Sequence, residues 1–263
     1  MKSSDAIIEV RSLTAGYGDR TILRDLDVDI RRGKVTAVVG GSGCGKSTLL
    51  KCVVGLLRPW EGTAHVDGRD LGSLDGPEQA QALAGVGLLF QQGAMLNSVT
   101  VAENVALPLE VHTDLPRSVI DEIVQLKLES VGLGHAAQLR PSELSGGMRK
   151  RAALARAMAL DPELLLCDEP SAGLDPQTAA ELDLLILQLK DIFRMTVVVI
   201  THELASITTI ADDVVMLGRG GVLHFAGSLS EAQASEVTEV RDFFARRTPE
   251  AAANTRSLWE ALT

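Results

Sequence analysis

The sequence predicts an α/β fold built on a mostly parallel sheet. Short runs of continuous apolar residues, such as "KVTAVV" (34–39) and "TVVVI" (196–200), are typical of strands that are covered on both faces. Helical patterns separate these runs along the chain, and strands that alternate with helices favour a parallel sheet. The 263 residues suffice for one large domain or two modest ones.

The expected elements follow in order. The alternation of Leu26, Val28 and Ile30 predicts a half-exposed strand and an N-terminal antiparallel β portion. Buried strands are expected at 34–39, 86–90, 164–168 and 196–200, and helices at 46–57, 117–131, 145–160 and 176–193. The mainly helical stretch that begins near residue 93 is too long for a simple crossover, so we expect an inserted helical subdomain at approximately 93–160.

Composition and charge restrict the classes of function. The chain is 46% apolar and 23% charged, as in an ordinary globular protein. Its net charge of −10 argues against a broad surface for phosphate backbones, so we expect no nucleic-acid partner. We find neither a signal-peptide core nor a run of roughly 18 uncharged apolar residues, and the three cysteines fit a reducing compartment. A cytoplasmic protein is expected.

The stretch "VVGGSGCGKSTLL" (38–50) matches the pattern G-x-x-x-x-G-K-[ST] between an apolar strand and a helix. Glycines let backbone N–H groups converge on phosphate oxygens, and the helix adds the positive end of its dipole. We expect Lys46 to reach the β and γ phosphates and Ser47 to ligate Mg²⁺. The candidate nucleotide-binding residues here are Gly40, Gly41, Ser42, Gly43, Cys44, Gly45, Lys46, Ser47 and Thr48. For Cys44, a buried apolar role and a reactive thiol both stay open.

The apolar run "LLLCDEP" (164–170) supplies a second part of the site. It ends in Asp168 and Glu169, an aspartate expected near the metal and a carboxylate placed to polarise water. Together with the glycine loop, the two carboxylates predict hydrolysis of a nucleoside triphosphate.

The segment "LSGGMRKRAALARAMALDPELLLCDEPSAGLDP" (144–176) resembles the ATP-binding subunit of ABC transporters. The resemblance covers about residues 7–227 and implies a P-loop NTPase fold of ABC type, with ATP and Mg²⁺ as cofactors. It implies that Tyr17 stacks on adenine, that Gln91 lies at the metal, and that His202 senses the γ phosphate. The catalytic residues that it implies are Lys46, Gln91, Glu169 and His202, with Ser47, Gln91 and Asp168 at the metal and Asp175 in the D-loop.

The signature of this resemblance consists of Ser145, Gly146, Gly147 and Met148, with methionine where the family usually has glutamine. Arg149, Lys150 and Arg151 follow in the first turns of the expected helix, an unfavourable charge sign for a helix N-terminus. Either an anion is expected there, or Lys150 and Arg151 belong to a solvated face. In ABC proteins the signature of one subunit covers the ATP on the P-loop of another, so the resemblance implies a head-to-tail homodimer.

The segment "QQGAMLNSVTVAENVALPL" (91–109), read with the signature segment, is similar to the ATPases of the Mla/Mce phospholipid and toluene-tolerance transport systems of double-membraned bacteria. This similarity implies a subunit that energises phospholipid transport between membranes and maintains outer-membrane lipid asymmetry. The implied partners are a transmembrane permease docked beside Gln91 and the helical insertion, an Mce-type lipid-binding subunit and accessory subunits. The implied location is the cytoplasmic face of the bacterial inner membrane. An amino-acid or drug transporter and a non-transport ATPase of cell-division type are the alternatives.

The expected domain boundary follows residue 227. We place the ABC ATPase domain at 5–227 and a C-terminal extension at 228–263, where Phe243, Phe244, Leu258, Trp259 and Leu262 stand on a polar background. The extension is either a partly ordered appendage or a set of aromatic anchors that contact a neighbouring subunit.

Overall fold

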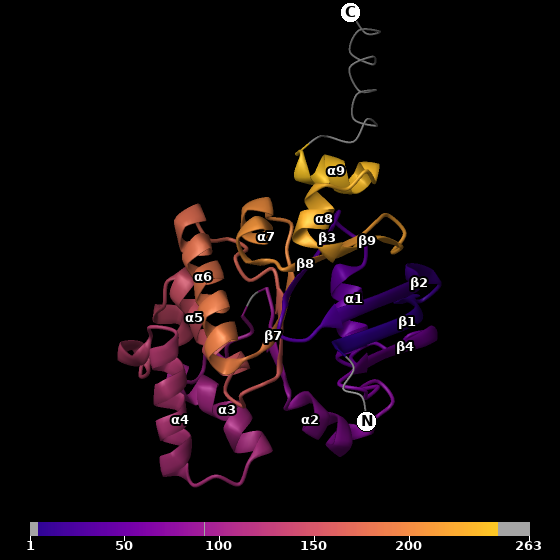
Figure 1. Ribbon diagram of the computed structural model, residues 1–263. Coiled ribbons are helices and arrows are strands. Elements are labelled where there is room, and N and C mark those ends of the chain that lie inside the picture. The colour runs from indigo at the N-terminus through magenta and orange to yellow at the C-terminus, as the bar shows by residue number, and fades with distance from the viewer. Residues whose placement is uncertain (1–4, 92, 247–263) are drawn as a thin grey trace, which may run out of the picture.

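The computed structural model of the chain describes residues 5–91 and 93–246 (Figure 1). The strands are β1 (Ala6–Tyr17), β2 (Arg20–Arg31), β3 (Val35–Gly40), β4 (Glu61–Val66), β5 (Val86–Leu89), β6 (Leu164–Asp168), β7 (Thr196–Ile200), β8 (Asp213–Leu217) and β9 (Leu223–Ser228). The helices are α1 (Lys46–Val53), α2 (Gly76–Leu83), α3 (Val101–His112), α4 (Arg117–Ser130), α5 (Gly146–Ala157), α6 (Pro176–Phe193), α7 (Leu204–Ile210), α8 (Leu229–Gln233) and α9 (Thr238–Phe244). Short 3₁₀ turns lie at Gly134–Ala136 and Pro141–Glu143. Within these residues no helix combines the length and the apolarity that a bilayer span requires.

The strands form two sheets. An antiparallel sheet has the order β2-β1-β4, and a larger sheet has the order β5-β6-β7-β3-β8-β9. The larger sheet is parallel except for β9, which runs antiparallel to β8. This arrangement confirms the mostly parallel core and the N-terminal antiparallel portion that the sequence predicts.

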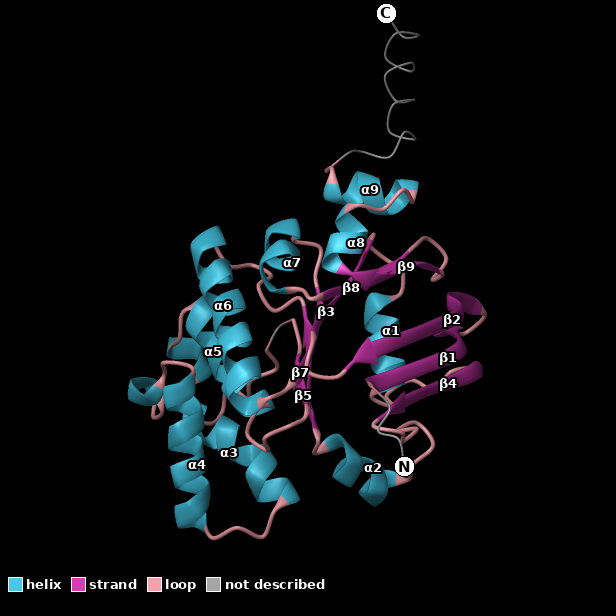
Figure 2. Ribbon diagram, in the orientation of Figure 1, coloured by secondary structure: helices cyan, strands magenta, loops and turns pink. Residues whose placement is uncertain are grey.

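The larger sheet lies between two covering layers (Figure 2). On one face, Leu154 of α5 and Leu189 of α6 join the same apolar cluster as Val199 of the sheet. On the other face, Leu50 of α1 and the antiparallel sheet cluster around Val198. Burial on both faces explains why these strands appear in the sequence as unbroken apolar runs.

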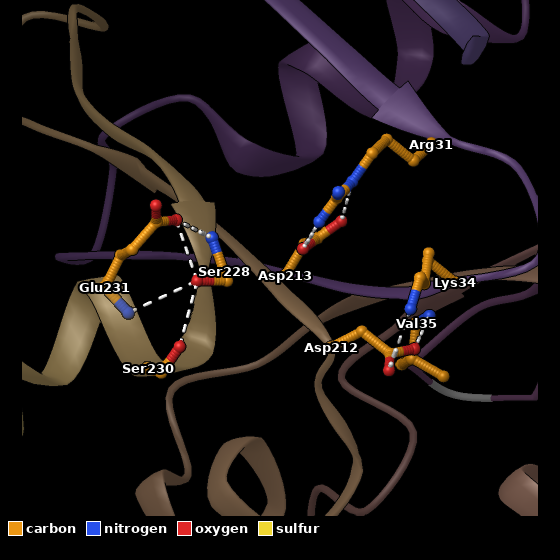
Figure 3. A network of polar contacts seen from close by, with 8 residues as sticks. All are labelled: Arg31, Lys34, Val35, Asp212, Asp213, Ser228, Ser230 and Glu231. Carbon is orange, nitrogen blue, oxygen red and sulfur yellow. Dashed lines mark hydrogen bonds and ion pairs between the residues drawn. The ribbon is translucent and has the colours of Figure 1, made fainter. Parts of the chain in front are cut away.

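Polar contacts fasten the antiparallel sheet to the core sheet beside β3 (Figure 3). Arg31, at the end of β2, donates through Nε to Asp213 of β8 at 2.8 Å. The neighbouring Asp212 accepts from the backbone N–H of Val35 at 2.8 Å and lies 3.7 Å from the ammonium of Lys34. These contacts fix the turn that leads from β2 into the strand that carries the glycine loop.

The four helices that the sequence predicts by range begin within one residue of the predicted positions. Helix α5 ends at Ala157 rather than at residue 160, and α1 is also shorter than expected. It ends at Val53, because Gly55 adopts a left-handed φ of 71°. The amide of Leu56 bonds back to Lys51 O at 2.8 Å and that of Gly55 to Cys52 O at 3.1 Å, the pattern of a Schellman cap. The helix predicted at 46–57 therefore stops one turn early.

The start of the C-terminal extension packs on its own chain. Val240 of α9 is fully buried in a cluster with Ile207 and Met216, and Phe243 and Phe244 pack against that cluster. The two phenylalanine rings meet edge to face, with centroids 5.4 Å apart. Leu258, Trp259 and Leu262 lie outside the described residues.

Candidate functional site

The carboxyl ends of four neighbouring strands bring the candidate residues to one edge of the core sheet. In the order β5-β6-β7-β3, these strands lead into Gln91, Asp168, His202 and Gly40 respectively. All four strands run parallel, so their carboxyl ends lie side by side. Ligands of open α/β sheets bind at such an edge.

The glycine loop adopts a backbone that only glycine fits at two positions. Gly40 has φ 146°, and a Cβ there would lie 2.3 Å from the carbonyl oxygen of Leu217. Gly45 has φ 110°, and a Cβ there would lie 2.5 Å from Leu23 Cδ2. Gly43, at φ 75°, has no atom within 4 Å of its Cβ position. The loop is therefore closed on its protein side and open on the other, as a phosphate cradle must be.

Helix α1 starts at this cradle with its N-terminus uncapped by any side chain. Gly45 occupies the N-cap position, where it offers no side-chain oxygen to the first amides. Lys46 Nζ donates to the carbonyl oxygens of Gly40 at 2.9 Å and Gly41 at 3.2 Å, so its charge lies along the loop. An uncapped helix start and an ammonium are groups that bind an anion.

A depression at this helix start is lined by the loop residues Gly43, Gly45, Lys46, Ser47 and Thr48 and also by Arg20 and Ile22. Arg20 is not among the site residues that the sequence predicts. Its signal was a cation three residues after Tyr17 in "AGYGDR", at the hairpin between β1 and β2.

Cys44 points away from the open side of the loop. It is only 3% exposed and belongs to the apolar cluster that contains Val38 and Leu49. The structure therefore favours the buried apolar role over the reactive thiol.

The oxygen donors expected for Mg²⁺ lie together. Ser47 Oγ donates to Asp168 Oδ2 at 3.2 Å, across the gap between α1 and β6. Hydroxyl and carboxylate oxygens suit Mg²⁺, which takes one or two protein ligands and completes its shell with phosphates and water. Residues 5–91 and 93–246 hold no cluster of three or more His, Cys, Asp or Glu side chains that could close around a metal. The donor set fits a metal bound together with a nucleotide.

Glu169 and His202 form a direct pair beside these donors. His202 Nδ1 lies 2.8 Å from Glu169 Oε1, and the backbone N–H of Glu169 donates to Ile200 O at 2.8 Å. The other carboxylate oxygen, Oε2, is buried and has no hydrogen-bond partner among the described residues. The pair therefore holds a carboxylate, a group that can act as a general base, at the sheet edge beside the metal donors.

Tyr17 ends β1, and Gln91 follows β5. Tyr17 is 47% exposed, its hydroxyl accepts from Lys51 Nζ at 3.3 Å, and the same ammonium lies 5.5 Å from its ring centroid. Gln91 is exposed and accepts through its backbone carbonyl from Lys150. Adenine stacking by Tyr17 and metal binding by Gln91 stay predictions.

The signature residues lie apart from the loop. Ser145 caps α5 by accepting from Met148 N at 3.2 Å, and α5 packs on the sheet face opposite to α1. Among the described residues, no hydrogen bond joins the stretch 145–148 to the loop 40–48. Asp175 caps α6 by accepting from the backbone of Thr178 at 3.0 Å and from its hydroxyl at 2.5 Å.

The basic residues after the signature differ from one another. Lys150 is only 8% exposed. The prediction that it belongs to a solvated face is therefore wrong. Arg151 lies 3.2 Å from Glu181 of α6, and Arg149 is exposed. Of these three residues, Arg149 is the one that is neither buried nor paired with a carboxylate.

Together, the uncapped loop, the Ser47–Asp168 contact and the Glu169–His202 pair define a P-loop nucleoside triphosphatase. The family model described as "ABC transporter" matches residues 23–172, and this chain belongs to the ABC transporter family of ATP-binding, ATP-hydrolysing subunits.

Two curated relatives and one solved structure illustrate the family. The chain is 45% identical over 206 residues to the intermembrane phospholipid transport system ATP-binding protein MlaF of Haemophilus influenzae, covering 78% of each protein. It is 41% identical over 236 residues to the probable ribonucleotide transport ATP-binding protein mkl of Mycobacterium leprae, covering 90% of this chain and 68% of that protein. It also matches the dimeric post-hydrolysis structure of the ATP-binding cassette MJ0796 bound to ADP and Pi, with a TM-score of 0.76, 28% identity, and coverage of 84% of this chain and 98% of that one.

Proposed function

We propose that this ATPase energises phospholipid transport between the membranes of a double-membraned bacterium. The structural observation that carries the catalytic part is the 2.8 Å contact between His202 and Glu169 beside the glycine loop. The 45% identity to a protein named for intermembrane phospholipid transport supports the substrate class. We also propose an ATPase domain at 5–227, with a helical subdomain at approximately 93–160, and an extension at 228–263.

In the proposed reaction the chain's own residues divide the work. Lys46 and the loop amides bind the phosphates, and Ser47 and Asp168 hold Mg²⁺, which when bound neutralises phosphate charge. Glu169 accepts a proton from the attacking water. His202 fixes the carboxylate by its 2.8 Å contact with Oε1.

We further propose that two copies of the chain form a head-to-tail dimer. The starts of α1 and α5 lie on opposite faces of one sheet, so a single chain does not bring its signature to its own loop. The dimeric state of the similar cassette MJ0796 supports this arrangement. In the dimer, Ser145, Gly146 and Gly147 of one chain would contact the ATP on the loop of its partner.

The exchange Glu169→Gln tests the site and the dimer together. Because the amide does not accept the proton, we expect ATP binding to persist while turnover falls by about 10²-fold to 10⁴-fold. ATP should then trap the chain as a dimer that gel filtration detects. The matched control is Glu163→Gln at the other end of β6, where the side chain is 75% exposed. Normal turnover in Glu169→Gln would contradict the role assigned to this carboxylate.

The substrate and the partners need a second experiment. We propose that a transmembrane permease docks beside Gln91 and the helical subdomain, that an Mce-type lipid-binding subunit and accessory subunits complete the assembly, and that the chain lies peripherally on the inner membrane. Purification from native membranes, followed by mass spectrometry of the associated subunits and bound molecules, should find a permease together with phospholipid. The relatives named for ribonucleotide transport define the contrary result, which is co-purified ribonucleotide in place of lipid.

A further inference from the structure

Lys150 joins three parts of the site through backbone carbonyls. Its side chain leaves α5 and is almost fully buried. Its ammonium donates to the carbonyl oxygen of Gln91, and at 3.3 Å to the carbonyl oxygen of Glu169. One side chain therefore ties the signature helix to the segment that follows β5 and to the catalytic segment that follows β6.

This placement is unfavourable for the charge itself. Burial lowers the pKa of Lys150, and the nearby groups Cys167, Glu169 and Asp168 only partly oppose that effect. No carboxylate among the described residues lies within ion-pair distance of its ammonium. Burying a cation costs desolvation free energy, so its burial is weak evidence that it stabilises the fold. The contacts of Lys150 therefore need another explanation.

A second buried lysine provides a contrast. Lys127 of α4 is 1% exposed, but its ammonium forms an ion pair with Asp161 and lies 4.1 Å from the ring centroid of Phe193. Its contacts satisfy the charge by themselves and touch no candidate site residue. The ammonium of Lys150 instead donates its hydrogen bonds to two segments of the site.

Glu169 has a backbone that requires support. Its φ is 50°, a left-handed conformation that residues with a Cβ seldom adopt and keep only where their surroundings hold it. The N–H of Glu169 is held by Ile200 O. Its carbonyl accepts from Ala172 N at 3.2 Å and from Lys150 at 3.3 Å. Lys150 is the contact that reaches this strained residue from a helix, α5.

We propose that Lys150 is a positioning residue that holds Glu169 in its hydrolytic geometry and makes that geometry depend on the placement of α5 in the same chain. The inference rests on the proposed function, because α5 begins with the signature that would meet the partner's ATP. ATP on one chain's loop would then favour hydrolysis at the loop of the other chain, which is a coupling between the two sites.

The exchange Lys150→Met tests the positioning role in the full-length chain. Methionine keeps the buried apolar stem and removes every donor. We expect kcat to fall between about tenfold and a hundredfold, with KM for ATP within about twofold, because misplacement of a catalytic group affects turnover and leaves nucleotide binding in place. Lys150→Arg, which restores donors, should recover most of kcat.

Lys127→Met is the matched control, because it also removes a buried ammonium from a helix of the same subdomain. We expect it to lower the midpoint of thermal unfolding while kcat per folded chain stays unchanged. Wild-type kcat in Lys150→Met, or equal losses of kcat in the two methionine variants, would overturn the proposal.

Mixed dimers test whether Lys150 acts within its own chain. One mixture pairs a chain that carries both Lys150→Met and Glu169→Gln with a wild-type chain, and the other pairs a Lys150→Met chain with a Glu169→Gln chain. Single-turnover hydrolysis should proceed in the first at the rate of a wild-type and Glu169→Gln dimer, and should fall in the second by the factor measured for Lys150→Met alone.

The opposite ranking would overturn the proposal, because it would mean that Lys150 acts through the signature on the partner's ATP. Gel filtration of Glu169→Gln with ATP is measured first. A monomer there would overturn the proposed dimer and the coupling that depends on it, which separates that failure from a failure of Lys150 itself.

Discussion

The two helices that meet nucleotide in the proposed dimer, α1 and α5, start in opposite ways. Helix α1 follows Gly45, which has a left-handed backbone and no capping side chain. Helix α5 follows Ser145 at an ordinary φ of −62°, and the serine oxygen already accepts from Met148 N. The first amides of α1 have no capping side chain and are left for a ligand, whereas α5 is already capped within the isolated chain.

The glycines at the two starts differ in the same sense. Gly40 could not become alanine without moving the backbone of Leu217. Gly146 has an ordinary backbone, and a Cβ there would meet only Leu174 Cδ2 at 3.5 Å. Gly40 is therefore required by the fold of the loop, whereas Gly146 leaves room for a group that comes from outside the chain.

The largest expected effect is that of Lys46→Ala. Because this exchange removes the ammonium from the cradle, we expect hydrolysis to fall by about 10³-fold, to background. A phosphate-release assay on the purified chain measures it. Lys190→Ala is the control, since Lys190 lies at the end of α6 and pairs with Asp191 at 3.1 Å. Substantial turnover in Lys46→Ala would contradict the assignment of the cradle.

A pair of alanine exchanges sharpens the comparison. Gly40→Ala should lower the free energy of unfolding by about 1–3 kcal/mol, because it combines a positive φ with a backbone clash. Gly146→Ala should stay within about 0.5 kcal/mol of wild type, yet weaken the ATP-dependent dimer. Urea unfolding and gel filtration measure the two effects. Equal losses of stability would remove the distinction between the two helix starts.

The smallest expected effect concerns Asp175, the N-cap of α6, which bonds to Thr178 next to the signature glycine Gly147. A Cβ on Gly147 would lie 2.6 Å from Thr178 Cγ2, and Thr178 is bonded by the N-cap Asp175 of α6. The hydrogen bonds from the Thr178 side chain and backbone lower the pKa of Asp175 below its ordinary value of 3.8. A lowered carboxyl pKa adds stability that is present above that ordinary value and is lost as the pH falls through the lowered pKa.

We therefore expect Asp175→Asn to unfold at a lower temperature than wild type at pH 6, and the gap to close as the pH falls below 3.8. Thermal unfolding between pH 6 and pH 2.5 measures it. A gap that is independent of pH would show that the carboxylate does not act as the charged cap.

Local pattern was enough to predict the core sheet and its loop. The apolar runs at β3, β6 and β7 are buried on both faces, and Leu182, Leu185 and Leu189 of α6 face the core as their spacing predicts. The motif residues Lys46, Ser47 and Asp168 meet at one sheet edge, because Asp168 ends β6 and the glycine loop after β3 leads into Lys46 and Ser47.

The features that the sequence did not predict depend on contacts between segments that are far apart along the chain. Lys150 looks like a surface lysine in "GGMRKR", and only its two bonds to residues 59 and 19 positions away reveal its role. Phe243 and Phe244 stand on a polar background, so their packing against the cluster around Ile207 is likewise tertiary. The early end of α1 could have been predicted from the sequence, because glycine is common just after the C-terminus of a helix and Gly55 stands there.

The placement of α1 and α5 on opposite faces of one sheet has a consequence for reaction order. In the proposed dimer each ATP needs groups from two chains, so the rate per chain rises with the amount of chain present and falls on dilution. Attachment of both copies to one membrane assembly would replace bulk concentration by a local one, on the order of millimolar for short flexible connections. The assembly would thereby suppress idle ATP consumption by chains that are not attached to it.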